Sequence, residues 1–178
     1  MGNLLESIAP VKEKYPYFRW IPEENLHITL AFLGEMDQRD LPQIIKAAEN
    51  TAGHGIINAG GGKLFTLPKG RAANVLVFGF DKGTEKMQFL AAEIRKNLHE
   101  RGILLSRDVP YFMPHITVAR RNFRADNKIN ELRINKEDAQ ISAEGDIITL
   151  CVFESILSGR GASYNCLAAF PLDAVPLP

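Results

Sequence analysis

The sequence predicts an α+β fold with mainly antiparallel sheets. Apolar residues recur at the i, i+3, i+4 and i+7 spacing of an amphipathic helix in residues 38–50 and again in residues 84–101. The C-terminal third instead contains two long strand-like runs joined by a glycine-containing turn, which is typical of a β-hairpin. Because helices and strands do not alternate regularly, the pattern argues against a βαβ fold, and the two helices argue against an all-β fold.

Local signals set the limits of each predicted element. We expect a short helix over residues 3–14, interrupted at Pro10 because proline lacks an amide hydrogen. Gly60, Gly61 and Gly62 precede a strand rather than a strand-to-helix junction, so they predict a turn or bulge and no nucleotide-binding loop. The remaining expected elements are strands over residues 26–33, 63–67, 74–80, 146–155 and 163–170, a further strand beginning at His115, and helices over residues 38–50 and 84–101.

Length and composition are those of a globular domain. The chain has 178 residues, and 21 Lys and Arg balance 21 Asp and Glu. We therefore expect one domain, residues 1–178, built of two halves. The zero net charge argues against a general nucleic-acid coat, although it leaves room for a local anion site. No apolar run approaches the roughly 18 residues of a membrane span, and the N-terminus lacks the pattern of a secretory signal.

The two cysteines, Cys151 and Cys166, lie in strand-like runs. Their spacing is not that of metal ligands, and they provide no disulfide framework. We interpret them as buried free thiols of a protein in the reducing cytoplasm. The sequence indicates no obligate protein partner.

A four-residue phrase occurs twice, about half the chain length apart. It reads His27-Ile28-Thr29-Leu30 in the first copy and His115-Ile116-Thr117-Val118 in the second. Residues i and i+2 of a strand share a face, so each copy offers an imidazole and a hydroxyl together. Two such strands predict one cleft in which two histidines act as acid and base without a metal.

A single His-x-Thr on a strand is more often structural than catalytic, so the repetition carries the argument. The other histidines, His54 in a turn-like stretch and His99 near a helix end, lack the pattern, and we interpret both as structural or solvent-facing. Basic residues gather in two places, where a solvated surface is the ordinary interpretation. The second group begins directly after the second motif, which favours an anion site there. The groups are Lys63, Lys69 and Arg71, and Arg120, Arg121 and Arg124.

The segments around both motifs resemble a known family. The run from Arg19 to Gly34 looks like the first motif block of the RNA 2′,3′-cyclic phosphodiesterases, also called 2′-5′ RNA ligases, of the two-histidine phosphoesterase superfamily. The run from Pro114 to Arg120 looks like the second block. With the C-terminal hairpin included, the resemblance extends from about residue 19 to residue 172.

The resemblance implies a bilobal fold, in which two pseudo-symmetric lobes with mainly antiparallel sheets flank a central cleft and each lobe provides one motif. It makes His27 and His115 the catalytic pair. Thr29, Thr117 and Arg120 would hold phosphate oxygens, and Phe32 would line the nucleotide site. The expected substrates are RNA ends or nucleotides that carry a 2′,3′-cyclic phosphate.

The chain departs from the family pattern in two places. The family usually opens with a short apolar strand before its first helix, whereas the helix predicted here starts almost at Met1. We therefore expect either a truncated start or a first lobe that closes differently. The family also often has a tryptophan in the strand matched by residues 75–78, and none is present. Base stacking is then expected to be altered, or to be supplied by Phe65 or Phe78.

The chemistry suits the pair of motifs. Opening a cyclic phosphate requires an activated water on one side of phosphorus and a protonated leaving oxygen on the other. By the resemblance, we expect His115 to be the general base and His27 the general acid, giving a 2′-phosphate. With a 5′-hydroxyl in place of water, the reverse reaction would join RNA ends without ATP. We expect no cofactor and no metal, since no third ligand stands at suitable spacing. Two alternatives are a phosphoesterase for a small cyclic phosphate or nucleotide derivative, and a non-catalytic module that binds RNA ends.

Overall fold

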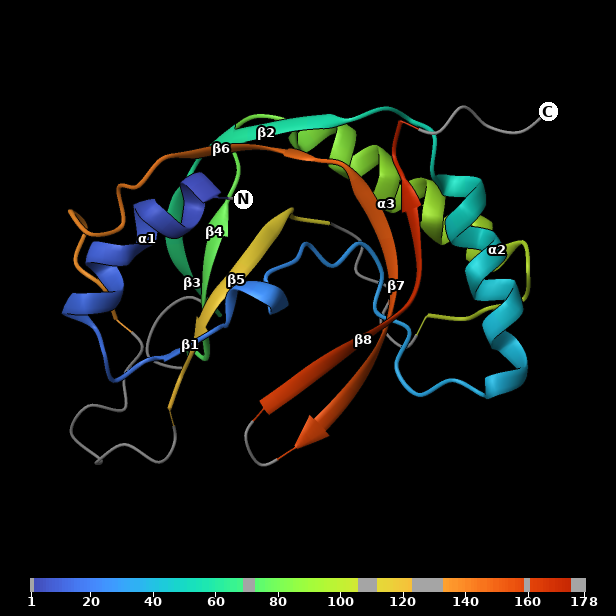
Figure 1. Ribbon diagram of the computed structural model, residues 1–178, viewed down its shortest axis with the longest axis horizontal. Coiled ribbons are helices and arrows are strands. Elements are labelled where there is room, and N and C mark those ends of the chain that lie inside the picture. Colours follow the sequence, from blue (N-terminus) through green and yellow to red (C-terminus); the bar gives the residue numbers. More distant parts are fainter. Residues whose placement is uncertain (1, 69–72, 106–111, 123–132, 159–160, 174–178) are drawn as a thin grey trace. The chain divides into compact units, whose positions relative to one another are not determined.

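The protein was analysed as a computed structural model, which describes residues 2–68, 73–105, 112–122, 133–158 and 161–173. The fold is α+β with antiparallel sheets, as predicted (Figure 1). The chain divides into two compact units. The first comprises Met1–Thr29, Asn58–Thr84 and Met113–Gly145, and the second comprises Leu30–Ile57, Glu85–Phe112 and Asp146–Pro178.

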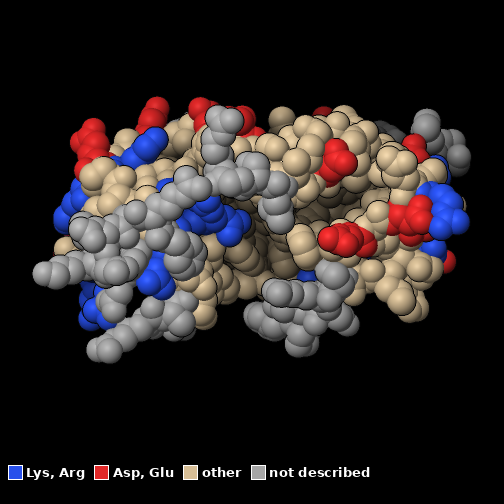
Figure 2. All heavy atoms as spheres, turned by 90° about the horizontal axis from the view of Figure 1, so that it is seen from below, with Lys and Arg blue, Asp and Glu red and all other residues tan. Residues whose placement is uncertain are grey.

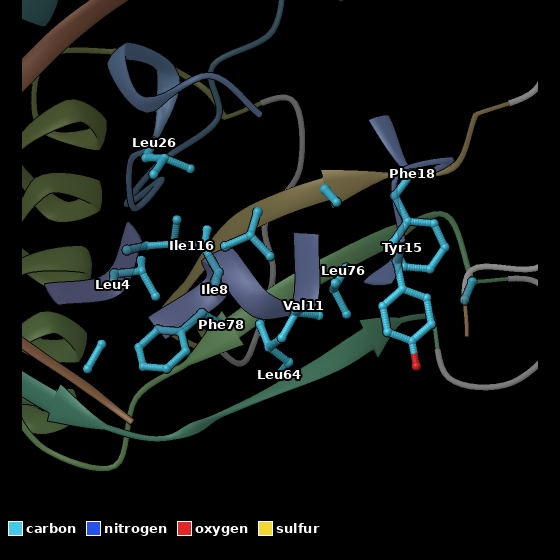
Figure 3. Close-up of a cluster of buried hydrophobic side chains, with 14 residues drawn as sticks. Leu4, Ile8, Val11, Tyr15, Phe18, Leu26, Leu64, Leu76, Phe78 and Ile116 are labelled. Carbon is cyan, nitrogen blue, oxygen red and sulfur yellow. The ribbon is translucent and has the colours of Figure 1, made fainter. Parts of the chain in front are cut away.

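The first unit is a four-stranded antiparallel sheet with a helix on one face. The strands follow the order β1-β5-β4-β3. Helix α1 packs on this sheet (Figures 1 and 3). The bounds are Gly2–Lys14 for α1, Arg19–Trp20 for β1, Lys63–Leu67 for β3, Val75–Gly79 for β4 and His115–Arg120 for β5.

The core of the first unit lies between α1 and this sheet. Leu4, Ile8 and Val11, spaced at i, i+4 and i+7, face Leu76, Phe78 and other apolar side chains of the strands (Figure 3). Burying a side chain of this size stabilises the fold by about 1.5–3 kcal/mol. The predicted interruption at Pro10 is therefore wrong: α1 runs through it, because buried residues on both sides of the exposed proline hold the helix to the sheet.

The strand predicted over residues 26–33 is also wrong. Only Ile28 forms a β-bridge in this segment, to Ile116 of β5, and the 3-10 turn Glu23–Asn25 precedes it. The cause is the crowding of this edge of β5. Strand β1 already pairs with Ala119 and Arg120, so the chain turns away and returns for a single contact farther along.

The second unit contains two helices and a long hairpin. Helices α2 (Leu41–Thr51) and α3 (Thr84–His99) confirm both predicted amphipathic segments, and strands β7 (Thr149–Ser158) and β8 (Gly161–Pro171) confirm the hairpin. The apolar stripe predicted for α3 is buried as expected. Its members are Met87, Leu90, Ala91, Ile94 and Leu98.

Strands β2 (Ile57–Gly61) and β6 (Ala143–Ile147) form a separate two-stranded pair. Both cysteines are unpaired thiols, but the expectation that they are buried is wrong: Cys151 is half-buried and Cys166 is exposed on the hairpin. None of the helices in the described residues is long and apolar enough to cross a membrane.

Candidate active site

The two repeated motifs lie side by side on the first unit. The antiparallel bridge between Ile28 and Ile116 places His27 directly opposite Thr117 and Thr29 directly opposite His115. Directly opposite residues have Cβ atoms about 4.5–5.5 Å apart, and diagonal residues such as the two histidines lie about 7–8 Å apart. One phosphate group therefore fits among all four side chains.

The four polar side chains also share a face. Ile116 is 2% exposed and belongs to the core, and Ile28 packs against the same core. Because side chains alternate along extended backbone, the imidazoles and hydroxyls point away from the core. His27, His115 and Thr117 are half-buried, and Thr29 is exposed. The sheet thus presents a polar array on the side opposite α1.

Each imidazole is held by a carbonyl two residues before it. Nδ1 of His27 lies 2.8 Å from the carbonyl oxygen of Asn25, and Nδ1 of His115 lies 2.7 Å from that of Met113. A carbonyl accepts only, so each Nδ1 is the protonated donor and the tautomer is fixed. Nε2 is then the nitrogen of each ring that exchanges a proton with a substrate.

Arg120 reaches this face through a β-bulge. Strict alternation would turn it away from His115 and Thr117. The pairing of β4 with β5 shifts between Leu76 and Val77, however, so that Leu76 pairs with Ala119 but Val77 pairs with Thr117. Val118 is the extra residue, and Arg120 returns to the face of Thr117. The guanidinium is placed to meet an anion held by the motifs.

An aromatic ring extends the same face on the other side of β5. Phe65 pairs with Val77, which pairs with Thr117, so these three residues form one row across the sheet. Gly79 pairs with His115, and the Phe65 ring lies so close over it that a Cβ on Gly79 would be 2.5 Å from Cε1 of Phe65. Of the two phenylalanines proposed for stacking, only Phe65 faces the site, since Phe78 is 1% exposed in the core.

Two further cations lie on this face that the motif analysis did not assign to the site. Arg19 of β1 pairs with Arg120, and Lys63 of β3 pairs with Gly79, beside His115. Both side chains are exposed. Figure 2 shows one face of the molecule, on which several Lys and Arg side chains lie close together. Strand register would have been needed to find either residue. Lys69, Arg71 and Arg124 lie outside the described residues.

Phe32 belongs to the second unit, where its side chain is 59% exposed. Its role in lining a nucleotide site stays a prediction. His54 contacts the Phe89 ring edge-to-face with ring centroids 5.0 Å apart, also in the second unit, and His99 ends α3. The boundary between the two units falls within the first motif, after Thr29. That each lobe provides one motif stays a prediction.

Within the described part of the chain, no group of three or more His, Cys, Asp or Glu side chains is placed to hold a metal ion. The array itself provides two imidazoles of fixed tautomer, two hydroxyl donors and a guanidinium. Such a set can bind one phosphate, remove a proton on one side of phosphorus and deliver a proton on the other.

Comparison with known proteins gives consistent matches. Residues 2–71 match the family model described as LigT like phosphoesterase. A protein of Aquifex aeolicus (strain VF5) named RNA 2′,3′-cyclic phosphodiesterase is 26% identical over 157 residues, which cover 86% of this chain and 81% of that protein. A solved structure from Thermus thermophilus has a TM-score of 0.78 at 20% identity and covers 97% of this chain and 93% of that one. The crystal structure of E. coli LigT complexed with 3′-AMP has a TM-score of 0.74 at 18% identity, with 98% and 94% covered.

Proposed function

We propose that this chain is a LigT-like phosphoesterase and hydrolyses RNA 2′,3′-cyclic phosphate ends to 2′-phosphates. The observation that carries the proposal is the four-residue array. Two imidazoles, each with Nδ1 bound to a carbonyl, lie diagonally on one sheet face with a threonine opposite each. The relative from Aquifex aeolicus that carries this activity in its name supports the same substrate class.

In the mechanism, Nε2 of His115 takes a proton from water as the water oxygen attacks phosphorus. The P–O3′ bond breaks, and Nε2–H of protonated His27 donates its proton to O3′ while phosphate stays on O2′. Threonine hydroxyls and the Arg120 guanidinium donate hydrogen bonds to the non-bridging oxygens, whose negative charge grows in the transition state. The fixed tautomers matter because a flipped ring would no longer present Nε2 to the substrate.

Reversal of the same steps, with a 5′-hydroxyl of a second RNA in place of water, would form a 2′-5′ linkage without ATP. We expect both directions to proceed without a metal or other cofactor, because the side chains supply acid, base and anion binding themselves. A cytoplasmic location suits the two free thiols.

The decisive experiment measures turnover of a short RNA that ends in a 2′,3′-cyclic phosphate, with EDTA present. His27→Ala and His115→Ala are each expected to lower kcat by about 10²–10⁴-fold, the usual contribution of a general acid or base. Phosphorus NMR of the product should locate phosphate on O2′. His54→Ala is the matched control, since His54 lies in the second unit, and it should retain activity.

A second candidate function is hydrolysis of a small cyclic phosphate or nucleotide derivative. The balanced charge of the chain favours it, because long RNA is usually held by an excess of cations. Equal kcat/KM for a mononucleotide cyclic phosphate and for an RNA end would support this candidate. Binding of RNA ends without turnover in the wild type would contradict both hydrolase functions and favour a non-catalytic module.

A further inference from the structure

We propose that Arg19 binds the phosphate that links the terminal nucleotide to its 5′ neighbour, with Arg120 opposite it bridging this phosphate and the cyclic phosphate held by the motifs. The chain would then select RNA ends over mononucleotides. This inference rests on the proposed function and names the part of the substrate that the two motifs leave unbound.

The first observation is a facing pair of like charges. Arg19 of β1 lies directly opposite Arg120 of β5 in the antiparallel register. Like charges directly opposite each other destabilise a sheet. Neither guanidinium forms a hydrogen bond or ion pair within the part of the chain that the structure describes. Two unneutralised guanidinium groups at this spacing form a site for a bridging anion, since each can donate two parallel hydrogen bonds to phosphate oxygens.

The second observation is the position of the pair relative to the motifs. The bulge at Val118 puts both arginines on the face of the histidines, one row beyond Thr117 and His27. Neighbouring rows on one face are about 7 Å apart, two residues of strand rise. This separation is of the order of the distance between successive phosphates of a nucleic-acid strand, so a second phosphate can lie over the arginine pair while the cyclic one lies among the motifs.

The proposed mechanism is consistent with an RNA chain that extends from the motifs toward the arginine pair. His27 donates to O3′, so O3′ and the ribose that carries it lie on the His27 side of phosphorus, and the RNA chain extends from that ribose. That is the side on which Arg19 and Arg120 lie. Lys63 lies at the opposite end, beside Gly79 and His115, where water enters. A strand path over Lys63 is therefore the competing arrangement, and the experiment separates the two.

The test compares hydrolysis of an RNA tetranucleotide ending in a 2′,3′-cyclic phosphate with that of a nucleoside 2′,3′-cyclic phosphate. For Arg19→Gln, we expect kcat/KM to fall about tenfold more for the tetranucleotide, the loss typical of one charge-assisted contact. Lys12→Gln, on the exposed side of α1 over the opposite face of the sheet, is the matched control for charge loss. Arg19→Lys should recover part of the tetranucleotide rate.

Binding is measured separately from turnover. Fluorescence anisotropy with a tetranucleotide carrying a terminal 2′-phosphate should give a salt dependence whose slope is smaller by about 0.7 in Arg19→Gln, the value for one phosphate contact on a single strand. The unliganded variant should melt no lower than the wild type, because a repulsive pair has been removed. A general folding defect would lower the melting temperature instead.

Equal losses for both substrates, an unchanged salt slope, or a tetranucleotide defect in Lys63→Gln but not in Arg19→Gln would each overturn the inference. If the wild type hydrolyses neither substrate, the proposed function fails. The anisotropy slopes would still decide whether Arg19 contacts a phosphate.

Discussion

The close contact between Phe65 and Gly79 permits a quantitative test of the site face. A methyl group at position 79 would place its Cβ 2.5 Å from Cε1 and 3.3 Å from Cζ of Phe65. Carbon atoms in good contact are about 3.5–4.0 Å apart. Gly79→Ala therefore displaces the ring by at least about 1 Å from its place beside His115.

Two opposing effects set the magnitude. Overpacking of this kind usually costs about 1–3 kcal/mol. Replacing glycine also lowers the entropy of the unfolded chain, which stabilises the protein by about 0.4–1 kcal/mol where the backbone tolerates alanine. Gly79 lies in a strand and is not among the positive-φ glycines, so that gain applies. The expected net loss for Gly79→Ala is about 1–2 kcal/mol.

A double-mutant cycle isolates the contact. With Phe65→Ala as background, the methyl group has room, and Gly79→Ala should become neutral or stabilising. Urea unfolding of the four proteins gives the free energy of unfolding of each, and the coupling energy between the two sites should be about 1–3 kcal/mol. A coupling energy near zero would refute the close approach of the ring to Gly79.

The same variants test the ring as a stacking surface. Stacking of a base on an aromatic side chain is worth about 1–3 kcal/mol. Phe65→Ala should then raise KM for a cyclic phosphate substrate by roughly five- to 150-fold with little change in kcat, and Phe65→Trp should restore it. Phe89→Ala removes an exposed ring of the second unit and is the control. An unchanged KM in Phe65→Ala would remove the ring from the substrate site.

Three further predictions follow from single interactions. Thr117→Val removes one hydroxyl donor beside the phosphate and should lower kcat by about 10²–10³-fold, measured in the cyclic phosphate assay. Hydrogen bonds from Lys14 and then Tyr15 lower the pKa of Asp138, so this carboxylate stabilises the fold above its unfolded pKa of about 3.9 and loses that contribution as pH falls through the folded pKa. The stability difference between wild type and Asp138→Asn in urea should therefore shrink between about pH 5 and pH 2. Leu98 of α3 is 1% exposed. Leu98→Ala leaves a cavity there and should lower the free energy of unfolding by about 2–5 kcal/mol in the same measurement.

Periodicity predicted much of the fold, and burial explains why. The stripe of α3 is visible in the sequence because one face of the helix is buried, and Met87 and Leu98 are both 1% exposed. The helix through Pro10 was not predictable from propensity, because packing of α1 on the sheet offsets the missing hydrogen bond. Alternation of apolar and polar residues predicts a strand after Leu26. Only Ile28 pairs with β5, however, because β1 pairs with the same strand.

Some residues of the candidate site are likewise predictable from the sequence, and others are not. His27 and His115 are detectable because a repeated pattern is improbable by chance, and the side-chain period of two already predicts that each carries its threonine on the same face. Arg120, counted by the same period, belongs on the opposite face, and Arg19 has no motif signal of its own. Val118 is one extra residue in β5, and it returns Arg120 to the face of Thr117. Arg19 lies on the same face because it pairs with Arg120. A bulge leaves no distinct mark in a run of small apolar residues. The proposed catalytic pair is therefore predictable from the repeated motif and Arg120 from the family resemblance, whereas Arg19 depends on strand register.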